Sequence, residues 1–126
     1  MCKTKQRGRS MLIPYKKEYE KIAMGLLSFM PGKKSIKIIR EWIDLYQTSK
    51  TSQLYLWKND TDRFIGVIGI KESGRRVYVN NITVDPSHRN EGHGTTMVKT
   101  LIVMNSLPVV GSERTKHFVD KCKVSS

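Results

Sequence analysis

The sequence lacks the features that mark a membrane protein, a disulfide-rich secreted protein or a metalloprotein. No stretch approaches the roughly 18 continuous apolar residues of a membrane span, and no apolar segment follows the basic N-terminus as a secretory signal requires. The only cysteines, Cys2 and Cys122, stand at opposite ends of the chain, without a CxxC pair or a His/Cys cluster. These absences predict a cytoplasmic protein with neither a disulfide framework nor a metal site.

Acidic residues are also scarce. The 126 residues include 11 Asp and Glu against 23 Lys and Arg, which gives a net charge of +12. Such an excess predicts an acidic partner without identifying it, because cofactor phosphates, nucleic acids and acidic proteins are all attracted to a basic surface. No helix-turn-helix, zinc or RNA-binding motif supports a nucleic acid, and scattered lysines that only keep the surface soluble would give the same charge.

The length is enough for one domain with a modest core. Residues 1–10 are basic and contain almost nothing to bury, so we expect them to form a disordered arm. A wrongly assigned translation start and a nucleic-acid-binding tail are two other interpretations of this arm. Residues 11–126 are expected to form the domain.

The hydrophobic pattern predicts an α/β domain of the α+β type. Strands are expected at 11–13, 53–58, 63–70, 76–84 and 107–110, and helices at 17–29, after a Ser35 N-cap, at 93–105 and at 113–122. Short turns join the three middle strands, which favours an antiparallel meander. We expect Phe118 to pack inside, and the core stripe of the second helix to be Ile36, Ile39, Trp42, Ile43 and Tyr46.

The most informative stretch joins the fourth of these strands to the third helix. After a β-branched strand and Pro86, the pattern Arg89-x-x-Gly92-x-Gly94 opens the helix. A loop that leads into a helix start offers several backbone N–H groups with no intrahelical partner. Their partial positive charge suits a phosphate or pyrophosphate, and the two glycines remove side chains that would hold the ligand off the backbone.

Two other glycine-loop motifs fit this stretch less well. The chain contains no Gly-x-x-x-x-Gly-Lys-Ser/Thr run, which excludes a P-loop. A Rossmann fingerprint would need a third glycine where Met97 stands, and it would follow the first strand rather than a late one. An ordinary glycine-rich loop before a helix is the remaining alternative.

The stretch from Ile82 to Gly94 resembles the pyrophosphate loop of the Gcn5-related N-acetyltransferases, which bind acetyl-CoA. The resemblance implies a mixed, mostly antiparallel sheet with flanking helices over nearly the whole of residues 11–122. A closer resemblance, to the RibT-type acetyltransferase-like proteins encoded with bacterial riboflavin-biosynthesis genes, rests on residues 21–31, 56–58 and 84–89. It implies the same fold and acyl donor, and a link to riboflavin biosynthesis.

The resemblance also implies which residues bind acetyl-CoA. Main-chain groups near Ile82, Thr83 and Val84 would bond the pantetheine arm and the thioester carbonyl. The pyrophosphate would lie on the backbone N–H groups of the loop residues Arg89, Asn90, Glu91, Gly92, His93, Gly94 and Thr95. Arg89 is expected to organise the loop and to add charge.

The catalytic residues are not identified by the sequence. The family often uses a tyrosine of the last helix as the acid, in a pattern of Asn, an aromatic residue or Leu six positions on, and then Tyr. Here Ser112 replaces the Asn, Phe118 keeps the aromatic residue and Val119 replaces the Tyr. The candidates for a general base are Glu72, His88 and His117, although a surface or structural role explains each of them better.

Three functions follow from these patterns. The first is an acetyl-CoA-dependent N-acetyltransferase that acts on a small amine by direct attack. The second is a non-catalytic, CoA-binding regulatory protein, and the third is a nucleic-acid-binding module.

The chain stops soon after the last helix, where fuller acetyltransferases add two strands, so the strand at 107–110 should be exposed at a sheet edge. This edge predicts either a homodimer or an open acceptor site.

Overall fold

The computed structural model describes residues 10–30, 32 and 34–124. The predicted arm, apart from Ser10, lies outside the described residues. None of the described helices is long and apolar enough to cross a membrane.

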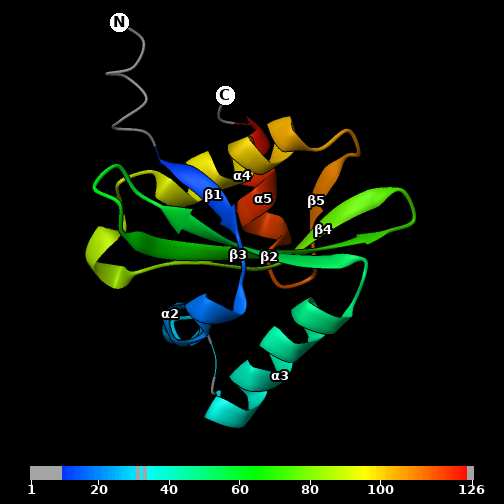
Figure 1. Ribbon diagram of the computed structural model, residues 1–126. Helices are drawn as coiled ribbons and strands as arrows, with labels where there is room; N and C mark the ends of the chain where they lie inside the picture. Colours follow the sequence, from blue (N-terminus) through cyan, green and yellow to red (C-terminus); the bar gives the residue numbers. More distant parts are fainter. Residues whose placement is uncertain (1–9, 31, 33, 125–126) are drawn as a thin grey trace, which may run out of the picture.

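A five-stranded sheet forms the centre of the molecule, with the strands in the order β1-β2-β3-β4-β5 (Figure 1). The strands are β1 (Met11–Pro14), β2 (Ser52–Lys58), β3 (Phe64–Ser73), β4 (Arg76–Val84) and β5 (Val109–Gly111). The first four pair antiparallel and β5 pairs parallel to β4, which confirms the predicted fold class and the predicted meander. Strand β5 lies at the edge of the sheet, as expected.

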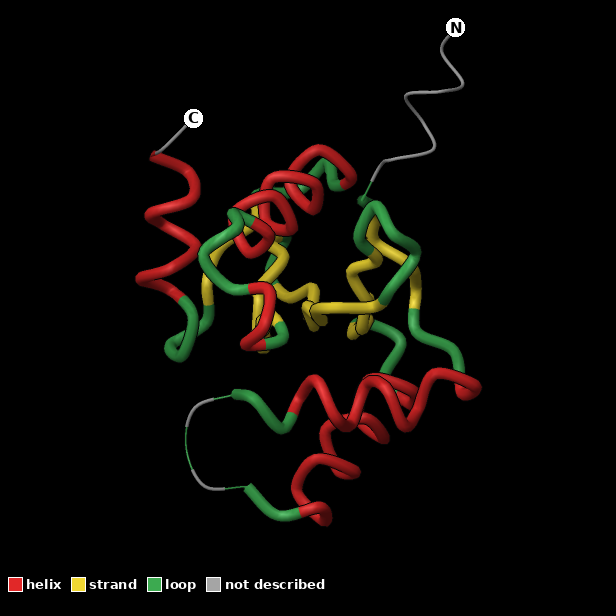
Figure 2. The backbone as a smooth tube through the Cα atoms, turned by 90° about the vertical axis from the view of Figure 1, so that its left-hand side faces the viewer, coloured by secondary structure: helices red, strands yellow, loops and turns green. Residues whose placement is uncertain are grey.

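Helices cover both faces of this sheet, so the molecule has three layers (Figure 2). One face carries α2 (Glu20–Leu27), which follows a 3-10 turn η1 (Lys17–Tyr19), and α3 (Ile36–Thr48). The other face carries α4 (His93–Met104) and α5 (Lys116–Val124). Ser35 caps α3 as predicted, since its Oγ accepts a hydrogen bond from the Ile38 amide at 3.2 Å.

The two helical layers bury two separate clusters of apolar side chains. Val67 on β3 belongs to the cluster beneath α2 and α3, whereas its neighbour Ile68 belongs to the cluster beneath α4 and α5. Because both faces are covered, residues 65–70 are all buried and read as a continuous apolar run rather than an alternating one.

The first predicted helix is shorter than the expected span 17–29. It begins as the 3-10 turn and ends at Leu27. The Phe29 amide bonds the Leu26 carbonyl and the Met30 amide bonds the Leu27 carbonyl, three residues back in each case. These tighter bonds close the last turn and turn the chain out of the helix.

Two expected core residues are exposed. Ile36 is 66% exposed, because it begins α3 on the side away from the stripe formed by Ile39, Ile43 and Tyr46. Phe118 is 37% exposed, while Val119 is completely buried. The last helix begins at Lys116 rather than at Glu113, and this start sets the phase that turns Val119 inward.

Candidate functional site

A β-bulge interrupts the pairing of β3 with β4. Gly69 lies opposite Asn81, but the next residue, Ile70, lies opposite Val79, so Asn80 is an extra residue in β4. A bulge of this kind bends its strand and reverses which backbone groups point to each side. It lies where β4 leaves its other neighbour, since the pairing of β4 with β5 covers only residues 77–79 and 109–111.

The bulge decides which backbone groups face the opening between β4 and β5. The Asp85 amide donates to the Ile65 carbonyl, so the backbone groups of Asp85 face β3. In an antiparallel ladder every second residue directs its N–H and C=O groups to the same neighbour, so the backbone groups of Thr83 also face β3. Ile82 and Val84 therefore direct their N–H and C=O groups away from β3, into the opening.

A hydroxyl latch holds the closed end of this opening. The Thr115 Oγ1 donates to the Val79 carbonyl at 2.5 Å, and the Ser112 amide approaches the same carbonyl at 3.2 Å. The Ser112 amide also lies 3.1 Å from the Thr115 Oγ1. Thr115 is buried. The latch thus fixes the turn between β5 and α5 against β4 at the last residue that the two strands share.

The loop after β4 is held by its own polar side chains. Asp85 accepts hydrogen bonds from the Ser87 amide at 2.9 Å and the Ser87 hydroxyl at 2.8 Å, and so caps the 3-10 turn η2 (Pro86–His88). These bonds lower the pKa of the Asp85 carboxyl below its ordinary value. The Arg89 Nε donates to the Val84 carbonyl at 3.1 Å, which ties the loop back to the strand.

The first turn of α4 presents its amides without a capping side chain. Its N-cap is Gly92, whose φ of +82° lies in the left-handed region that favours glycine. Gly94 is close to α5, since a β-carbon there would lie 2.9 Å from the Phe118 Cζ. The helix N-terminus therefore meets the aromatic ring of Phe118 across the gap between α4 and α5.

These elements enclose a cavity of about 580 Å³, which we name the loop pocket. It is lined by the end of α2, by β4, by the loop and first turn of α4, and by the start of α5. The residues are Phe29, Met30, Ile82, Thr83, Val84, His88, Arg89, Asn90, Gly92, His93, Gly94, Thr95, Arg114, Thr115 and Phe118.

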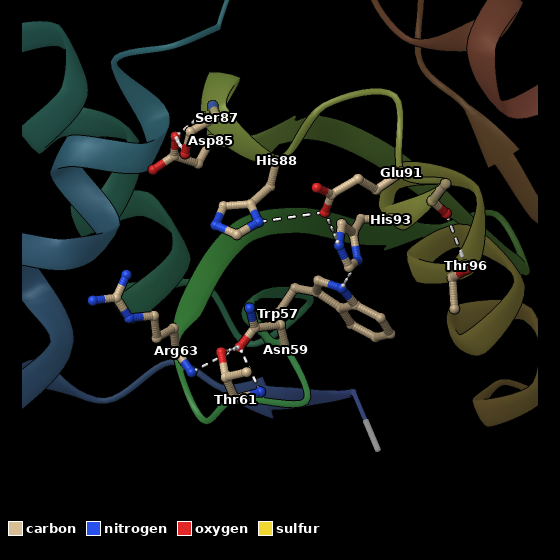
Figure 3. A network of polar contacts seen from close by, with 11 residues as sticks. Trp57, Asn59, Thr61, Arg63, Asp85, Ser87, His88, Glu91, His93 and Thr96 are labelled. Carbon is tan, nitrogen blue, oxygen red and sulfur yellow. Dashed lines mark hydrogen bonds and ion pairs between the residues drawn. The ribbon is translucent and has the colours of Figure 1, made fainter. Parts of the chain in front are cut away.

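Glu91 is the one predicted binding residue outside this lining. Its Oε1 accepts from the His93 Nε2 at 3.0 Å and lies 3.4 Å from the His88 Nδ1 (Figure 3). The hydrogen bond to His93 and, next, the contact with His88 lower the pKa of the Glu91 carboxyl. The carboxylate thus holds the two imidazoles at the edge of the pocket.

His88, Glu91 and His93 bring their ligand atoms within 4.8 Å of one another, a spacing that suits a metal ion. The Trp57 Nε1, however, donates to the His93 Nδ1 at 3.1 Å. Because an indole nitrogen can only donate, the neutral His93 ring carries its proton on Nε2, the atom that faces Glu91. A protonated nitrogen has no lone pair for a metal, so the hydrogen bonds of this cluster do not fit a metal site.

A second cavity, of about 480 Å³, lies between α3, the bulge of β4 and the turn after β5, and we name it the α3 pocket. Its lining residues are Trp42, Leu45, Tyr46, Asn80, Asn81, Ser112, Glu113 and Arg114. The buried Tyr46 hydroxyl donates to the Asn81 Oδ1 at 2.5 Å, and burial raises the pKa of Tyr46 above its ordinary value. The Arg114 guanidinium lies 5.7 Å from the centroid of the Trp42 ring.

The candidate bases are not brought together. Glu72 pairs with Val77 near the β3–β4 turn, at the end of the hairpin away from the loop. His117 is exposed on α5 and lines neither pocket, whereas His88 lines the loop pocket. Tyr46 is buried, as the predicted core stripe requires, but the sequence does not predict that Tyr46 and Arg114 line a pocket, because nothing in their local sequence shows that they meet the β4 bulge.

Comparison with known proteins places these features in a family. The sequence profile of the acetyltransferase (GNAT) family matches residues 14–104. A Bacillus methanolicus protein described as an uncharacterized N-acetyltransferase in the lysA 3′ region is 43% identical over 116 residues, which cover 90% of this chain and 96% of that protein.

Solved structures agree in fold. An aminoglycoside 6′-N-acetyltransferase from Acinetobacter haemolyticus superimposes with a TM-score of 0.70 at 13% identity, covering 90% of this chain and 86% of that chain. The aminoglycoside N-acetyltransferase AAC(6′)-Iy, solved in complex with CoA, gives a TM-score of 0.69 at 11% identity, covering 90% and 82%.

Proposed function

Because the chain belongs to the acetyltransferase (GNAT) family of N-acetyltransferases, we propose that it binds acetyl-CoA in the loop pocket and transfers the acetyl group to a small amine. One observation carries the assignment of the pocket. The outward-facing backbone groups of Ile82 and Val84 lead along the β4–β5 opening to the uncapped first turn of α4. A strand edge followed by a helix N-terminus suits an amide-containing arm that ends in a pyrophosphate.

The pyrophosphate would lie on the amides of the first turn of α4. These N–H groups and the helix dipole favour an anion, and the Phe118 ring fills the space beside Gly94 and forms one wall for it. Arg89 adds a positive charge while its Nε stays bonded to the Val84 carbonyl. The imidazoles of His88 and His93 are held by Glu91 and Trp57, so they shape the wall rather than contact the phosphates.

In this proposal the pantetheine arm follows β4 in the way an added strand would. The N–H and C=O groups of Ile82 and the N–H group of Val84 offer it strand-like hydrogen bonds. The thioester supplies an activated acyl carbon, and an amine attacks that carbon as the C–S bond breaks and the amine proton passes to water. A main-chain N–H aimed at the carbonyl oxygen would stabilise the charge that develops there, an effect worth about 3 kcal/mol per donor in other enzymes.

The amine would reach the thioester from the α3 pocket. That pocket begins at the bulge residues Asn80 and Asn81, beside the point where β4 and β5 separate. The resemblance to the RibT-type proteins adds the finer proposal that the amine belongs to flavin metabolism. CoA thiol release, measured with a panel of amines that includes flavin-pathway intermediates, tests this point.

A non-catalytic, CoA-binding regulatory protein is the second candidate. The family often has a tyrosine that acts as the general acid at the position of Val119. The observation in favour of the regulatory protein is that Val119 cannot donate a proton and is completely buried. A CoA thiolate is a fair leaving group, so the loss of that acid slows transfer without preventing it. Release of CoA thiol with any amine favours the enzyme, whereas tight acetyl-CoA binding without release favours the regulatory protein.

The decisive test of the pocket is calorimetric titration with acetyl-CoA. We expect micromolar binding by the natural protein and none by Gly94→Glu, because the new carboxylate would lie at the helix N-terminus where the pyrophosphate binds. Gly25→Glu is the matched control, since Gly25 is exposed on α2, lines neither pocket and has open space around it. Equal binding by all three proteins would show that the pocket is assigned wrongly.

A further inference from the structure

Arg114 is the one described residue that lines both cavities. It lies in the turn between β5 and α5, directly before the latch residue Thr115. The latch fixes this turn against β4, so the position of Arg114 at the boundary of the two pockets follows from the backbone. A group at that boundary is well placed to contact an acceptor whose amine approaches the thioester.

The charge of Arg114 has no acidic partner within ion-pair distance among residues 10–30, 32 and 34–124. The Arg114 guanidinium lies 5.7 Å from the centroid of the Trp42 ring. Burial raises the pKa of Tyr46, and the nearby charge of Arg114 opposes that rise. A guanidinium held on an aromatic face keeps its N–H groups free for an anion. The contact with Trp42 therefore fixes the place of the guanidinium, and no carboxylate of the described residues pairs with its charge.

The same contact argues against a polycationic acceptor. The Trp42 face would be the natural site for a second ammonium group, but Arg114 already occupies it. The carboxylate of Glu113 also lines the α3 pocket and, like Arg114, it is exposed to solvent; the contact with the Trp42 ring distinguishes the guanidinium from it. With a net charge of +12, the chain as a whole attracts anions rather than cations.

Building on the proposed function, we propose that the acceptor is an amine that carries an anionic group, with Arg114 as the residue that selects it. The guanidinium binds the carboxylate or phosphate of the acceptor in the α3 pocket, and the amine end extends toward Asn80 and Asn81 at the bulge. A volume of about 480 Å³ is enough for a small metabolite of this class. Arginine forms paired hydrogen bonds with carboxylates and phosphates alike, so the two anions are distinguished by experiment.

The test compares acceptors that differ only in the anion. The probes are 4-aminobutyrate against butylamine, phosphoethanolamine against ethanolamine, and 1,4-diaminobutane as a dication. We expect kcat/KM for the anionic member of at least one pair to exceed that of its neutral partner by about tenfold or more. The pair with the larger ratio identifies carboxylate or phosphate as the natural anion.

Substitutions at Arg114 and at the control position Arg76 assign the preference to a side chain. Arg114→Gln should reduce the ratio to about one through the KM for the acceptor, with the KM for acetyl-CoA unchanged, and Arg114→Lys should keep part of the preference. Arg76→Gln, at the exposed start of β4 and in the lining of neither pocket, is the control and should retain the preference. If Arg114→Gln weakens acetyl-CoA binding instead, Arg114 contacts the acyl donor and the proposal is wrong.

Binding measurements separate this proposal from the proposed function. Calorimetry on the CoA-saturated protein reports acceptor affinity whether or not acetyl transfer occurs. Tighter binding of the anionic member, lost in Arg114→Gln, supports the anion site even if no amine is acetylated. Preference for the diamine, equal affinity for paired probes, or no binding of any probe would overturn it.

Discussion

The Tyr46 hydroxyl donates its hydrogen bond to the Asn81 Oδ1 in a buried environment. The Tyr46 ring packs against Gly69, where a β-carbon would collide with it. Gly69 and Asn81 lie opposite each other in the β3–β4 register, at the last pair before the bulge. One phenol from α3 thus fixes both strands at the position where the direction of the β4 backbone groups reverses.

Replacing Tyr46 tests this contact. Tyr46→Phe leaves the Asn81 Oδ1 buried without its partner, so we expect the free energy of unfolding to fall by about 1–3 kcal/mol in urea titrations. Tyr78→Phe is the matched control on β4, and its effect should stay within about 0.5 kcal/mol. Equal losses in the two variants would mean that the Tyr46–Asn81 bond contributes nothing specific.

The length of β5, only three residues, determines where the opening beside β4 begins. This strand pairs with β4 only over Val77–Val79, and the Thr115 latch ends that pairing at the Val79 carbonyl. Beyond this point the two strands separate, and the opening carries the outward-facing groups of Ile82 and Val84. The short length of β5 is therefore a condition for the opening.

Removing the latch hydroxyl should loosen this end of the opening. Thr115→Val keeps the shape of the side chain but deprives the buried Val79 carbonyl of its shortest hydrogen bond, so we expect a loss of roughly 1–2 kcal/mol in the free energy of unfolding. We also expect a higher Kd for acetyl-CoA by calorimetry.

Thr115→Ser should restore both values, because it returns the hydroxyl. Thr100→Val is the control, since its hydroxyl bonds the Thr96 carbonyl on an exposed face of α4. Unchanged acetyl-CoA affinity in Thr115→Val would show that the latch does not shape the opening.

The sequence predicts the elements better than it predicts how they meet. Turn clusters and period-two patterns are local, so the meander and the loop before α4 are readable from residues 53–95. The bulge at Asn80 cannot be predicted in this way, because nothing in the sequence of β4 shows which of its residues is left unpaired. The phase of α5 was predicted wrongly for a similar reason, since its start depends on a bond from Thr115 to Val79, 36 positions away.

The candidate site divides in the same way. Residues 82–95 follow one another along the chain, so a single motif predicts most of the loop pocket. The α3 pocket combines α3, the bulge and the turn after β5, three segments that only the tertiary fold brings together. The role of Arg114 therefore depends on its position between the two pockets, which no local motif predicts.

At the scale of the whole molecule, both core clusters share the central strands. Residues of β2 and β3 contribute alternately to the cluster under α2 and α3 and to the cluster under α4 and α5. A loss of packing on one face thus exposes the strands that support the other. This arrangement predicts one cooperative unfolding transition rather than two.

Acetyl-CoA should raise the stability of this single unit. At a free concentration 100 times its Kd, a ligand that binds only the folded state adds about 2.7 kcal/mol, which corresponds to a rise in Tm on the order of 10 °C for a domain of this size. Scanning calorimetry measures the shift, and Gly94→Glu should show none. Two transitions of which only one moves with ligand would contradict the shared core.

The two tryptophans of the chain lie on opposite sides of the sheet. The Trp57 indole is bonded to His93 at the rim of the loop pocket, whereas Trp42 lies beneath Arg114 in the α3 pocket. The α3 pocket therefore contains one intrinsic fluorophore, and the other lies directly behind His93 in the wall of the loop pocket. With one indole replaced by phenylalanine, stopped-flow emission from the other would follow a single cavity as it fills, so the order in which the two substrates arrive can be timed without an attached dye.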